Sequence, residues 1–291
     1  MSGTPTNRTT IGLPADVARE ILAKTQEASA VMTLARRIDL PGRGVEIPVI
    51  TSDPTAEWVS ETGAKPVSNP GLTKKIMNAY KLAVIVPFSN EFRRDAAALY
   101  DELVRRLPLA LARQFDATVI GGTAPGSNFD VFTACTPYDI ETGTYGQLVA
   151  ANAEIAAAGG DMNGFALSPQ GKGVLLGAVD KNDRPLFVNS ATEGMGNLVL
   201  GAPVAISKGA YVAGTPDDIV GVAGDWTQAL YGTVEGVTID YSSDATLIDA
   251  SNNAINLFQQ NMFAVRAEIE VGFRADTACF ALLTKDAESE S

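Results

Sequence analysis

The sequence predicts an α+β fold in which a long hairpin, a long helix and a lobe of short mixed elements follow one another. Three observations support this prediction. Residues 45–88 contain two extended patterns around a polar centre, residues 89–121 repeat apolar residues every three or four positions, and residues 131–250 mix short helical and strand patterns. The last segment, 263–283, returns to the period of a strand.

The first 44 residues are expected to form an arm with one short helix. Pro14 suits a first helical turn, and Val17 and Ile21 follow at helical spacing. The first fourteen residues do not combine a basic start with an apolar run, so we expect no signal peptide.

Residues 45–88 predict a hairpin with a buried root and a polar tip. Apolar and polar residues alternate from Val45 to Val49, and the chain returns as a second strand over residues 76–88. At ~3.3 Å per residue, such a hairpin is ~40–50 Å long.

The tip of this hairpin carries a tryptophan, but the hairpin itself offers no hydrophobic core in which to bury it. Trp58 follows Glu57 and precedes Glu61, in a stretch rich in Pro, Gly, Ser and Asn. Isolated two-stranded hairpins are only marginally stable in water. We therefore expect another subunit to supply the missing surface; the alternative is a loop that folds back on its own domain.

Residues 89–121 predict the longest helix. Ser89 is a candidate N-cap, and Gly121 starts the glycine pair that ends the helix. At ~1.5 Å per residue the helix is ~45 Å long. Pro108 is expected to kink or divide it, and Asp116 is expected on a polar face beside arginines.

Short elements fill the remainder of the chain. We expect helices over 145–158 and from Ser168-Pro169 to Val179, and strands over 165–167, 198–200, 204–206, 219–223 and 237–241. Residues 263–274 predict a half-buried strand, and residues 278–283 are expected to pair with it after a short turn.

Composition narrows the class of protein. Apolar residues make up 46% and charged residues 19%, which is typical of a globular protein, and no window of about 18 apolar residues predicts a membrane span. Of the net charge of −12, residues 1–120 contribute +2 and residues 121–291 contribute −14. The acidic half repels nucleic acid at long range, and no basic face typical of a sequence-reading DNA-binding protein is visible.

Enzymatic chemistry has little support. The chain has no histidine, and its two cysteines, Cys135 and Cys279, are expected to be buried free thiols. No phosphate-binding or dinucleotide-binding glycine motif occurs. We expect no metal, cofactor or catalytic residue. A remote alternative is a carboxylate-based hydrolase that uses Asp217, Asp218 and Asp225.

Six stretches resemble, in the same order, segments of the HK97-fold major capsid proteins of tailed bacteriophages. They are AEWVSETGAKPVSNP (56–70), KLAVIVPFSNEFRRDAAALYDELVRRLPLALARQFDATVIGG (81–122), LLGAVDKNDRPLF (175–187), LVLGAPVAISKGA (198–210), GDWTQALYGTVEGVTIDYS (224–242) and NMFAVRAEIEVGFRADTACFALL (261–283). Each stretch alone is weak, but six in the right order over residues ~45–285 are a specific signal.

The resemblance implies an HK97-like capsid fold in five parts. These are an N-terminal arm (1–44), an E-loop hairpin (45–88), the first part of a peripheral P domain with a spine helix (89–130), an axial A domain (131–250), and closing P-domain strands with a C-terminal tail (251–291). The E-loop of this family lies over a neighbouring subunit.

The implied function is self-assembly into hexamers and pentamers of an icosahedral phage head that encloses double-stranded DNA without sequence-specific binding. The implied further partners are a portal and, in some relatives, scaffolding or decoration proteins. The implied location is the virion, and the host cytoplasm during assembly. A nearby alternative with the same fold is an encapsulin, the shell protein of a bacterial nanocompartment.

If the chain is a capsid protein, as the resemblance implies, its functional residues are those at subunit interfaces rather than those of a catalytic site. Trp58 is a candidate anchor, because buried aromatic residues dominate interfaces. Candidates for charged pairs between subunits are Glu57, Glu61, Lys65, Lys74, Lys75, Arg93, Arg94, Arg105 and Arg106. The alternative for each is a solvated surface charge that contributes ~0–1 kcal/mol. Some relatives cross-link a loop lysine to an asparagine, but the closing segment has no matching asparagine, so that chemistry is not expected.

Overall fold

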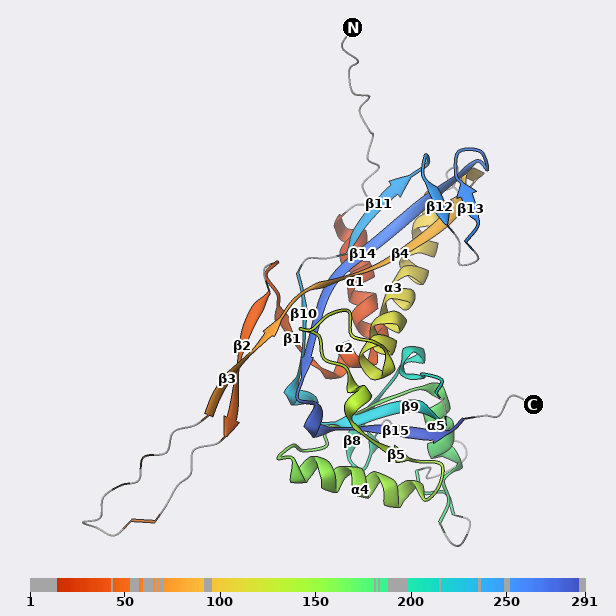
Figure 1. The fold of residues 1–291 in the computed structure, drawn as a ribbon. Coiled ribbons are helices and arrows are strands. Elements are labelled where there is room, and N and C mark those ends of the chain that lie inside the picture. Colours follow the sequence, from red (N-terminus) through yellow and green to blue (C-terminus); the bar gives the residue numbers. More distant parts are fainter. Residues whose placement is uncertain are drawn as a thin grey trace.

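Figure 1 shows an elongated body made of two sheets with their helices, and one hairpin that projects from its side. The computed structural model describes residues 15–42, 44–52, 58–59, 65, 67, 71–91, 96–180, 182, 184–187, 198–214, 216–234, 237–248 and 252–287. Pro14 lies outside this part of the chain.

The first sheet has five strands arranged around one long strand. They are β1 (Arg36–Asp39), β4 (Tyr80–Ser89), β10 (Ala229–Thr233), β11 (Thr238–Ser242) and β14 (Met262–Ala275). Strand β4 runs antiparallel along one edge of β14, while β10 and β11 share its other edge. The strand predicted at 263–274 is confirmed, and β14 is the centre of this sheet.

Two helices lie side by side along this sheet, α1 (Ala15–Ala28) and α3 (Ala96–Gly121). Their buried apolar side chains meet those of β14 in one core cluster, which includes Ile21, Leu107, Leu111, Phe263 and Val265. Burial of this shared face, at about 25 cal/mol per Å² of apolar surface, holds the helices to the sheet.

The N-terminal half differs from the sequence predictions in three details. The arm continues past α1 into a short helix, α2 (Ala30–Leu34), and then β1, neither of which was predicted. Ser89 is the last residue of β4, paired with Met262, and its hydroxyl oxygen accepts the Glu91 N–H at 3.4 Å; residues 92–95, which lead into α3, lie outside the described part of the chain. Helix α3 passes through the buried Pro108 without interruption, so the proline does not divide it.

The second sheet has six strands in the order β5-β15-β9-β6-β8-β7. Their bounds are β5 (Thr136–Asp139), β6 (Gly164–Leu167), β7 (Leu198–Val199), β8 (Ala202–Ile206), β9 (Asp217–Gly224) and β15 (Phe280–Asp286). Helices α4 (Thr144–Ala157) and α5 (Pro169–Gly177) pack on it through buried residues such as Leu148, Ile155 and Leu175.

Most local elements of this lobe are confirmed, but one strand pairing is wrong. The Ser168 hydroxyl accepts the Gly171 N–H at 3.0 Å and caps α5 as expected. Residues 278–283 do not pair with β14; β15 lies instead between β5 and β9 in the second sheet. Strands β10 and β11, which lie within residues 131–250, join β14 in the first sheet, while β15 does not.

Two strand pairs lie outside these sheets. Strands β12 (Thr246–Ile248) and β13 (Ala254–Asn256) form a small ribbon, and β2 (Val45–Ser52) pairs with β3 (Gly71–Met77) to form the projecting hairpin. The second strand predicted over 76–88 is divided after Met77: its first part belongs to the hairpin, and the rest is β4 in the first sheet.

A cluster of aromatic rings joins the two sheets. Phe115 of α3 and Phe273 of β14 belong to the first sheet and its helices. Phe280 is the first residue of β15 in the second sheet. Phe132 of η2 (Phe132–Ala134) touches both sides, with ring centroids 5.6 Å from Phe273 and 4.5 Å from Phe280. Trp226 of η4 (Trp226–Gln228) completes the cluster, 5.3 Å from Phe280.

Both cysteines are buried free thiols, as predicted. Cys135 follows η2 and Cys279 ends η5 (Thr277–Cys279), beside the aromatic cluster. Burial raises the pKa of Cys135 to about 12, which disfavours the reactive thiolate.

Candidate assembly surface: the projecting hairpin and its root

The β2–β3 hairpin is joined to the body at one end only. Among the described strands, β2 and β3 pair only with each other, in register from Val45 opposite Met77 to Ser52 opposite Gly71. The seven residues of β3 span roughly 23 Å at ~3.3 Å per residue. Figure 1 shows the pair extending away from both sheets. A two-stranded hairpin in this position is marginal on its own.

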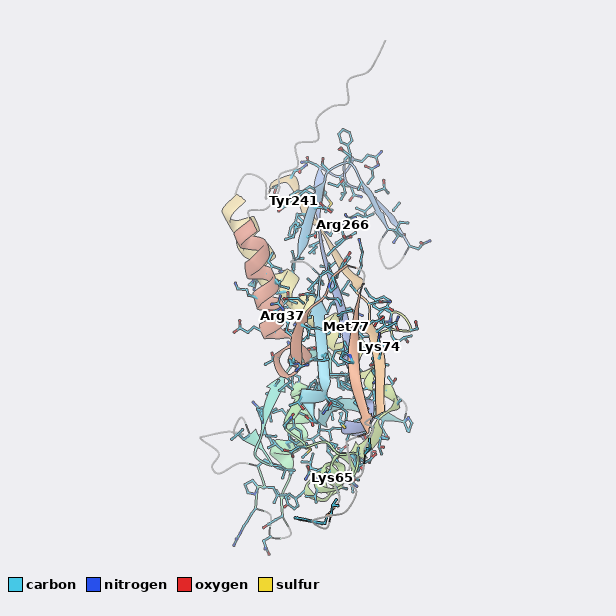
Figure 2. All side chains as sticks on the ribbon, turned by 90° about the vertical axis from the view of Figure 1, so that its left-hand side faces the viewer. Arg37, Lys65, Lys74, Met77, Tyr241 and Arg266 are labelled. Carbon is cyan, nitrogen blue, oxygen red and sulfur yellow. The ribbon has the colours of Figure 1, made fainter. Side chains whose placement is uncertain are left out.

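Two cationic side chains tie the root of the hairpin to β14. The Arg274 Nε donates to the Ile76 carbonyl oxygen at 2.7 Å, and the Lys75 Nζ donates to the Ala275 carbonyl oxygen at 3.0 Å. Met77, the last residue of β3, is fully buried where the hairpin enters the body (Figure 2). The root is thus held by side chains that cross between the hairpin and the sheet.

Arg274 also binds the segment that follows α3. Its Nη1 lies 2.7 Å from Asp130 Oδ1, and its Nη2 donates to Asn128 Oδ1 at 2.9 Å. The second carboxylate oxygen of Asp130 accepts the Ala275 N–H at 3.1 Å. Only 11% of the Arg274 side chain is exposed, so these charge-assisted bonds are well shielded from water. One guanidinium therefore fixes three parts of the chain relative to one another.

Glycines allow the backbone to turn into the hairpin. Gly44 has φ +81°, and a Cβ at this position would lie 2.6 Å from Asn78 Oδ1. A Cβ on Gly272 of β14 would lie 2.6 Å from the Asn78 carbonyl oxygen. Backbones approach too closely here for any larger residue, so the exit angle of the hairpin is built into the chain.

The hairpin's predicted interface residues have different surroundings. Trp58 and Lys65 are exposed, so Trp58 does not fold back on its own domain. Lys74 forms an exposed ion pair with Glu46 of β2, which by hydrogen bonding raises the pKa of Lys74. Lys75 already donates to Ala275 within the subunit.

The remaining predicted interface charges are distributed as follows. Arg105 and Arg106 are exposed on α3. Glu57, Glu61, Arg93 and Arg94 lie outside the described residues. Of the predicted charges that the structure describes, Lys74 and Lys75 lie on β3 and Arg105 and Arg106 lie on α3, so they belong to different elements.

A buried carboxylate on α3, which the sequence interpretation missed, links the arm to α3 and to the lobe formed by the second sheet. Asp116 of α3 is fully buried and accepts the Ser29 hydroxyl at 2.5 Å and the Ala30 N–H at 2.9 Å. The Val31 N–H also donates to it, at 3.3 Å. The Ser207 side chain, which precedes η3 (Lys208–Ala210) in the second lobe, hydrogen-bonds to the same group. Burial raises the pKa of Asp116, and these hydrogen bonds oppose the rise.

The sequence did contain a signal for this residue. Asp116 follows Ala112 by four positions and precedes Val119 by three, so it lies on the apolar stripe of α3. A carboxylate in an apolar stripe needs donors, and the start of α2 supplies them. Ser29 also caps α2 by accepting the Met32 N–H at 3.1 Å.

The acidic residues considered for hydrolysis do not form a catalytic pair. Asp217 and Asp218 begin β9 and Asp225 follows its other end, so the strand separates them by roughly 23 Å. Asp218 accepts the Tyr211 hydroxyl at 2.8 Å and the Gly214 N–H at 3.1 Å. These bonds hold the pKa of Asp218 below its usual value.

Asp225 has a structural role at the other end of β9. Burial alone would raise the pKa of Asp225, but hydrogen bonds from Thr227, Asp161 and Asn163 outweigh it and lower the pKa. The Asn163 Nδ2 donates at 2.7 Å and the Thr227 hydroxyl at 2.6 Å. In the part of the chain that the structure describes, no three potential metal ligands lie together, and no helix is both long and apolar enough to cross a bilayer.

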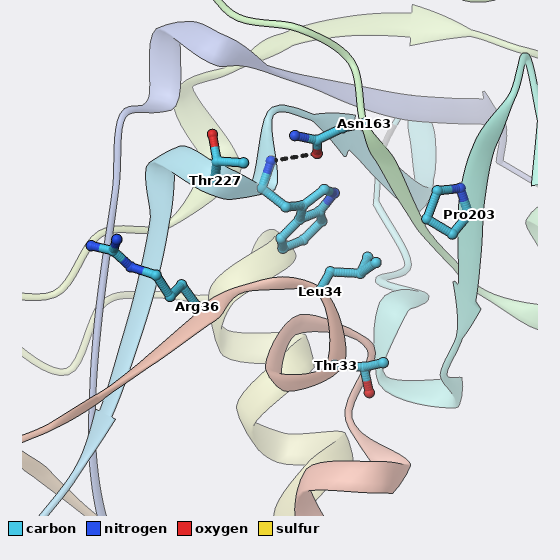
Figure 3. Close-up of a pocket in the computed structure, with 7 residues that line it drawn as sticks. Thr33, Leu34, Arg36, Asn163, Pro203 and Thr227 are labelled. Carbon is cyan, nitrogen blue, oxygen red and sulfur yellow. Dashed lines mark hydrogen bonds between the residues drawn. The ribbon is translucent and has the colours of Figure 1, made fainter.

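Figure 3 shows a pocket of about 520 Å³ where the arm meets the second lobe. Its lining residues are Thr33, Leu34, Arg36, Asn163, Pro203, Trp226 and Thr227. The arm contributes the end of α2 and the start of β1, and the lobe contributes β8, η4 and the residue before β6.

Comparison with known proteins decides the family. A family model described as "Phage capsid family" matches residues 10–283. The chain belongs to the phage capsid family. A probable major capsid protein, gp17 of Mycobacterium phage L5, is 32% identical over 94% of this chain and 89% of its own length. The major capsid protein of Staphylococcus phage 80alpha is 24% identical over 90% of this chain and 82% of its own length.

Solved structures share the fold of this phage capsid chain. A chain of Gordonia phage Cozz matches with a TM-score of 0.69 and 24% identity, over 90% of this chain and 88% of its own. A chain of Microbacterium phage Oxtober96 matches with a TM-score of 0.70 and 21% identity, over 98% and 95%. The expected α+β, HK97-like capsid fold is confirmed, and these relatives do not favour the encapsulin or hydrolase alternatives.

Proposed function

We propose that this member of the phage capsid family is the major capsid protein of a tailed bacteriophage. Copies self-assemble into hexamers and pentamers of an icosahedral head that encloses double-stranded DNA. The observation that carries the proposal is the β2–β3 hairpin, which is fixed firmly at its root and carries an exposed tryptophan beyond its strands. A projection of this kind gains stability when it packs against another copy.

In this proposal each part of the structure has a role in the shell. The hairpin is the E-loop, the sheet around β14 with α1 and α3 is the P domain, and the sheet around β9 is the A domain. Trp58 serves as an interface anchor, with Lys65, Arg105 and Arg106 as charged contacts between subunits. The acidic second half of the chain favours packing and release of DNA over tight binding to it.

The proposal also covers partners and location. The assembled shell works with a portal, and with scaffolding or decoration proteins if the phage encodes them. The protein acts in the virion after assembly in the host cytoplasm. Its role is structural, without catalysis.

The direct test is to shorten the hairpin. We expect a variant in which residues 53–70 are replaced by a short turn to fold as a subunit but to form no stable shells. Analytical ultracentrifugation and negative-stain electron microscopy of the wild type and the variant measure this. In a matched control, the same residues are replaced one for one by Gly and Ser, which keeps the length but removes the side chains.

The outcomes separate the alternatives. Shells of normal size and yield from the shortened variant would overturn the E-loop assignment. A wild-type chain that stayed a compact monomer at high concentration would overturn the capsid function itself. Particle diameter and a portal vertex would distinguish a phage head from a nanocompartment.

A further inference from the structure

The pocket between the arm and the second lobe has a floor that is already formed. Trp226 and Leu34 supply apolar surface, and Trp226 is held by its Nε1, which donates to the Gly164 carbonyl oxygen at 3.0 Å. Its backbone N–H donates to Asn163 Oδ1 at 2.9 Å (Figure 3). A Cβ on Gly164 would lie 2.6 Å from Trp226 Cδ1, so the chain fits closely around the ring. A group that entered the pocket would therefore not have to order this surface.

The rim of the pocket is polar and carries a positive charge. Arg36 lines it and is exposed, and no acidic side chain is among the lining residues that the structure describes. The Thr33 hydroxyl donates to the Ser29 carbonyl oxygen, and the Thr227 hydroxyl donates to Asp225 Oδ1. Both hydroxyl oxygens therefore keep lone pairs that can accept a hydrogen bond from a bound group. The site suits an apolar group that carries an N–H and has negative charge beside it.

The same chain carries a group with this chemistry. Trp58 is 105% exposed, so its own subunit leaves the whole indole in solvent. Glu57 and Glu61 flank it in the sequence and complement Arg36 in charge. Pockets of ~300–1,000 Å³ accommodate groups of this size.

Another exposed aromatic residue is a poorer match. Phe258 is 79% exposed, but its neighbours in the sequence, from Asn256 to Asn261, carry no charge. Its ring has no N–H to donate to the rim. Charge and hydrogen bonding therefore favour Trp58.

We propose that the pocket of one copy receives Trp58 of a neighbouring copy, with Glu57 and Glu61 close to Arg36 at the rim. The inference rests on the proposed function, because it specifies the surface on which the E-loop tip docks. It makes the arm a part of the contact between subunits, since α2 and β1 form one wall of the pocket. Buried aromatic and arginine residues are the types that dominate interface energies.

The first test needs no substitution. The chain has two tryptophans, and the other, Trp226, is buried. In dissociated subunits, acrylamide should quench one accessible and one protected population of tryptophan fluorescence. In assembled shells both populations should be protected, and the emission should shift to shorter wavelength.

The second test is a charge swap. Arg36→Glu should raise the subunit concentration needed for assembly by roughly tenfold, a change of ~1.4 kcal/mol, and Glu57→Lys with Glu61→Lys should do the same. The combined variant should recover most of the loss, because opposite charges face each other again. Arg184→Glu, a matched change at another exposed arginine, should leave assembly unchanged.

The outcomes distinguish this inference from the proposed function. Shells in which one tryptophan stays quenchable, or a combined variant no better than the single changes, would overturn the docking of Trp58 while the capsid function stands. A wild-type chain that forms no shells would overturn both. Circular dichroism of each variant separates lost assembly from lost folding.

Discussion

Removal of the Asp116 carboxylate should destabilise the subunit more than most single substitutions. In Asp116→Ala the Ser29 hydroxyl and the Ala30 and Val31 N–H groups lose their acceptor in a fully buried site. Each unsatisfied buried donor costs ~1–3 kcal/mol. The variant also no longer buries a charge, which offsets part of this loss. We expect a net loss of about 3–5 kcal/mol, typical of removing one partner from a buried charged network.

Urea denaturation of unassembled subunits, followed by tryptophan fluorescence and circular dichroism, measures the change in the free energy of unfolding. Asp217→Ala is the matched control, because it removes an exposed carboxylate and should change stability by no more than about 0.5 kcal/mol. If Asp116→Ala also cost less than about 1 kcal/mol, the carboxylate would not be what satisfies the start of α2, and our account of this junction would be wrong.

The pKa of Asp116 adds a dependence on pH that checks the same reasoning. Its pKa is raised in the folded state, so the folded chain binds more protons than the unfolded chain between the two pKa values. The contribution of Asp116 to stability therefore falls as pH rises above the unfolded value. The advantage of the wild type over Asp116→Asn should be largest at acidic pH and should shrink as pH increases. An advantage that grew with pH would contradict the burial argument.

Three further predictions concern the hairpin root and the second lobe. Arg274→Met should leave the subunit folded but speed amide hydrogen exchange in β3 and lower the yield of shells, because the guanidinium bonds the Ile76 carbonyl oxygen; unchanged exchange would show that the strands alone fix the root. Gly44→Ala should lower the free energy of unfolding by about 1–3 kcal/mol, because Gly44 has φ +81° and Asn78 lies close to it. Gly173→Ala is the control and should not lower it, because a Cβ there meets open space. The lowered pKa of Asp225 should stabilise the wild type relative to Asp225→Asn above pH ~4, and this advantage should disappear as pH falls through the folded pKa; an advantage that persisted at low pH would refute it.

Elements with a strong local period could be predicted from the sequence. β14 alternates over many residues, and α4 and α5 carry their glycine and Ser-Pro boundary signals, so each was located within a few residues. The fold class and the family resemblance depended on the order of such elements. Local pattern was sufficient wherever one element buries one face.

Strand pairing could not be predicted in the same way, because distant parts of the chain decide it. Residues 280–285 are buried on both faces, as in a central strand, yet adjacency in sequence suggested a hairpin with β14. The division between β3 and β4 depends on Gly44 and Gly272, which approach Asn78 only in the folded chain.

The candidate site was predicted only in outline. The sequence identified the hairpin and the exposed Trp58, because the polar residues around Trp58 offer it no hydrophobic core. It did not identify Arg274, whose partners come from two distant segments, β3 and residues 128–130. The charge of Asp116 predicted a polar face, whereas its position in the apolar stripe of α3 buries it.

The aromatic cluster between the two sheets bears on how identical copies could tile a closed surface. Phe132 contacts Phe273 on one side and Phe280 on the other, and each such ring pair contributes about 0.5–1.5 kcal/mol beyond its buried area. Bending the subunit between its two sheets would separate these rings, so the two sheets should move as one rigid body. In the proposed shell, differences in curvature between fivefold and sixfold positions would then be taken up where the hairpin leaves the body.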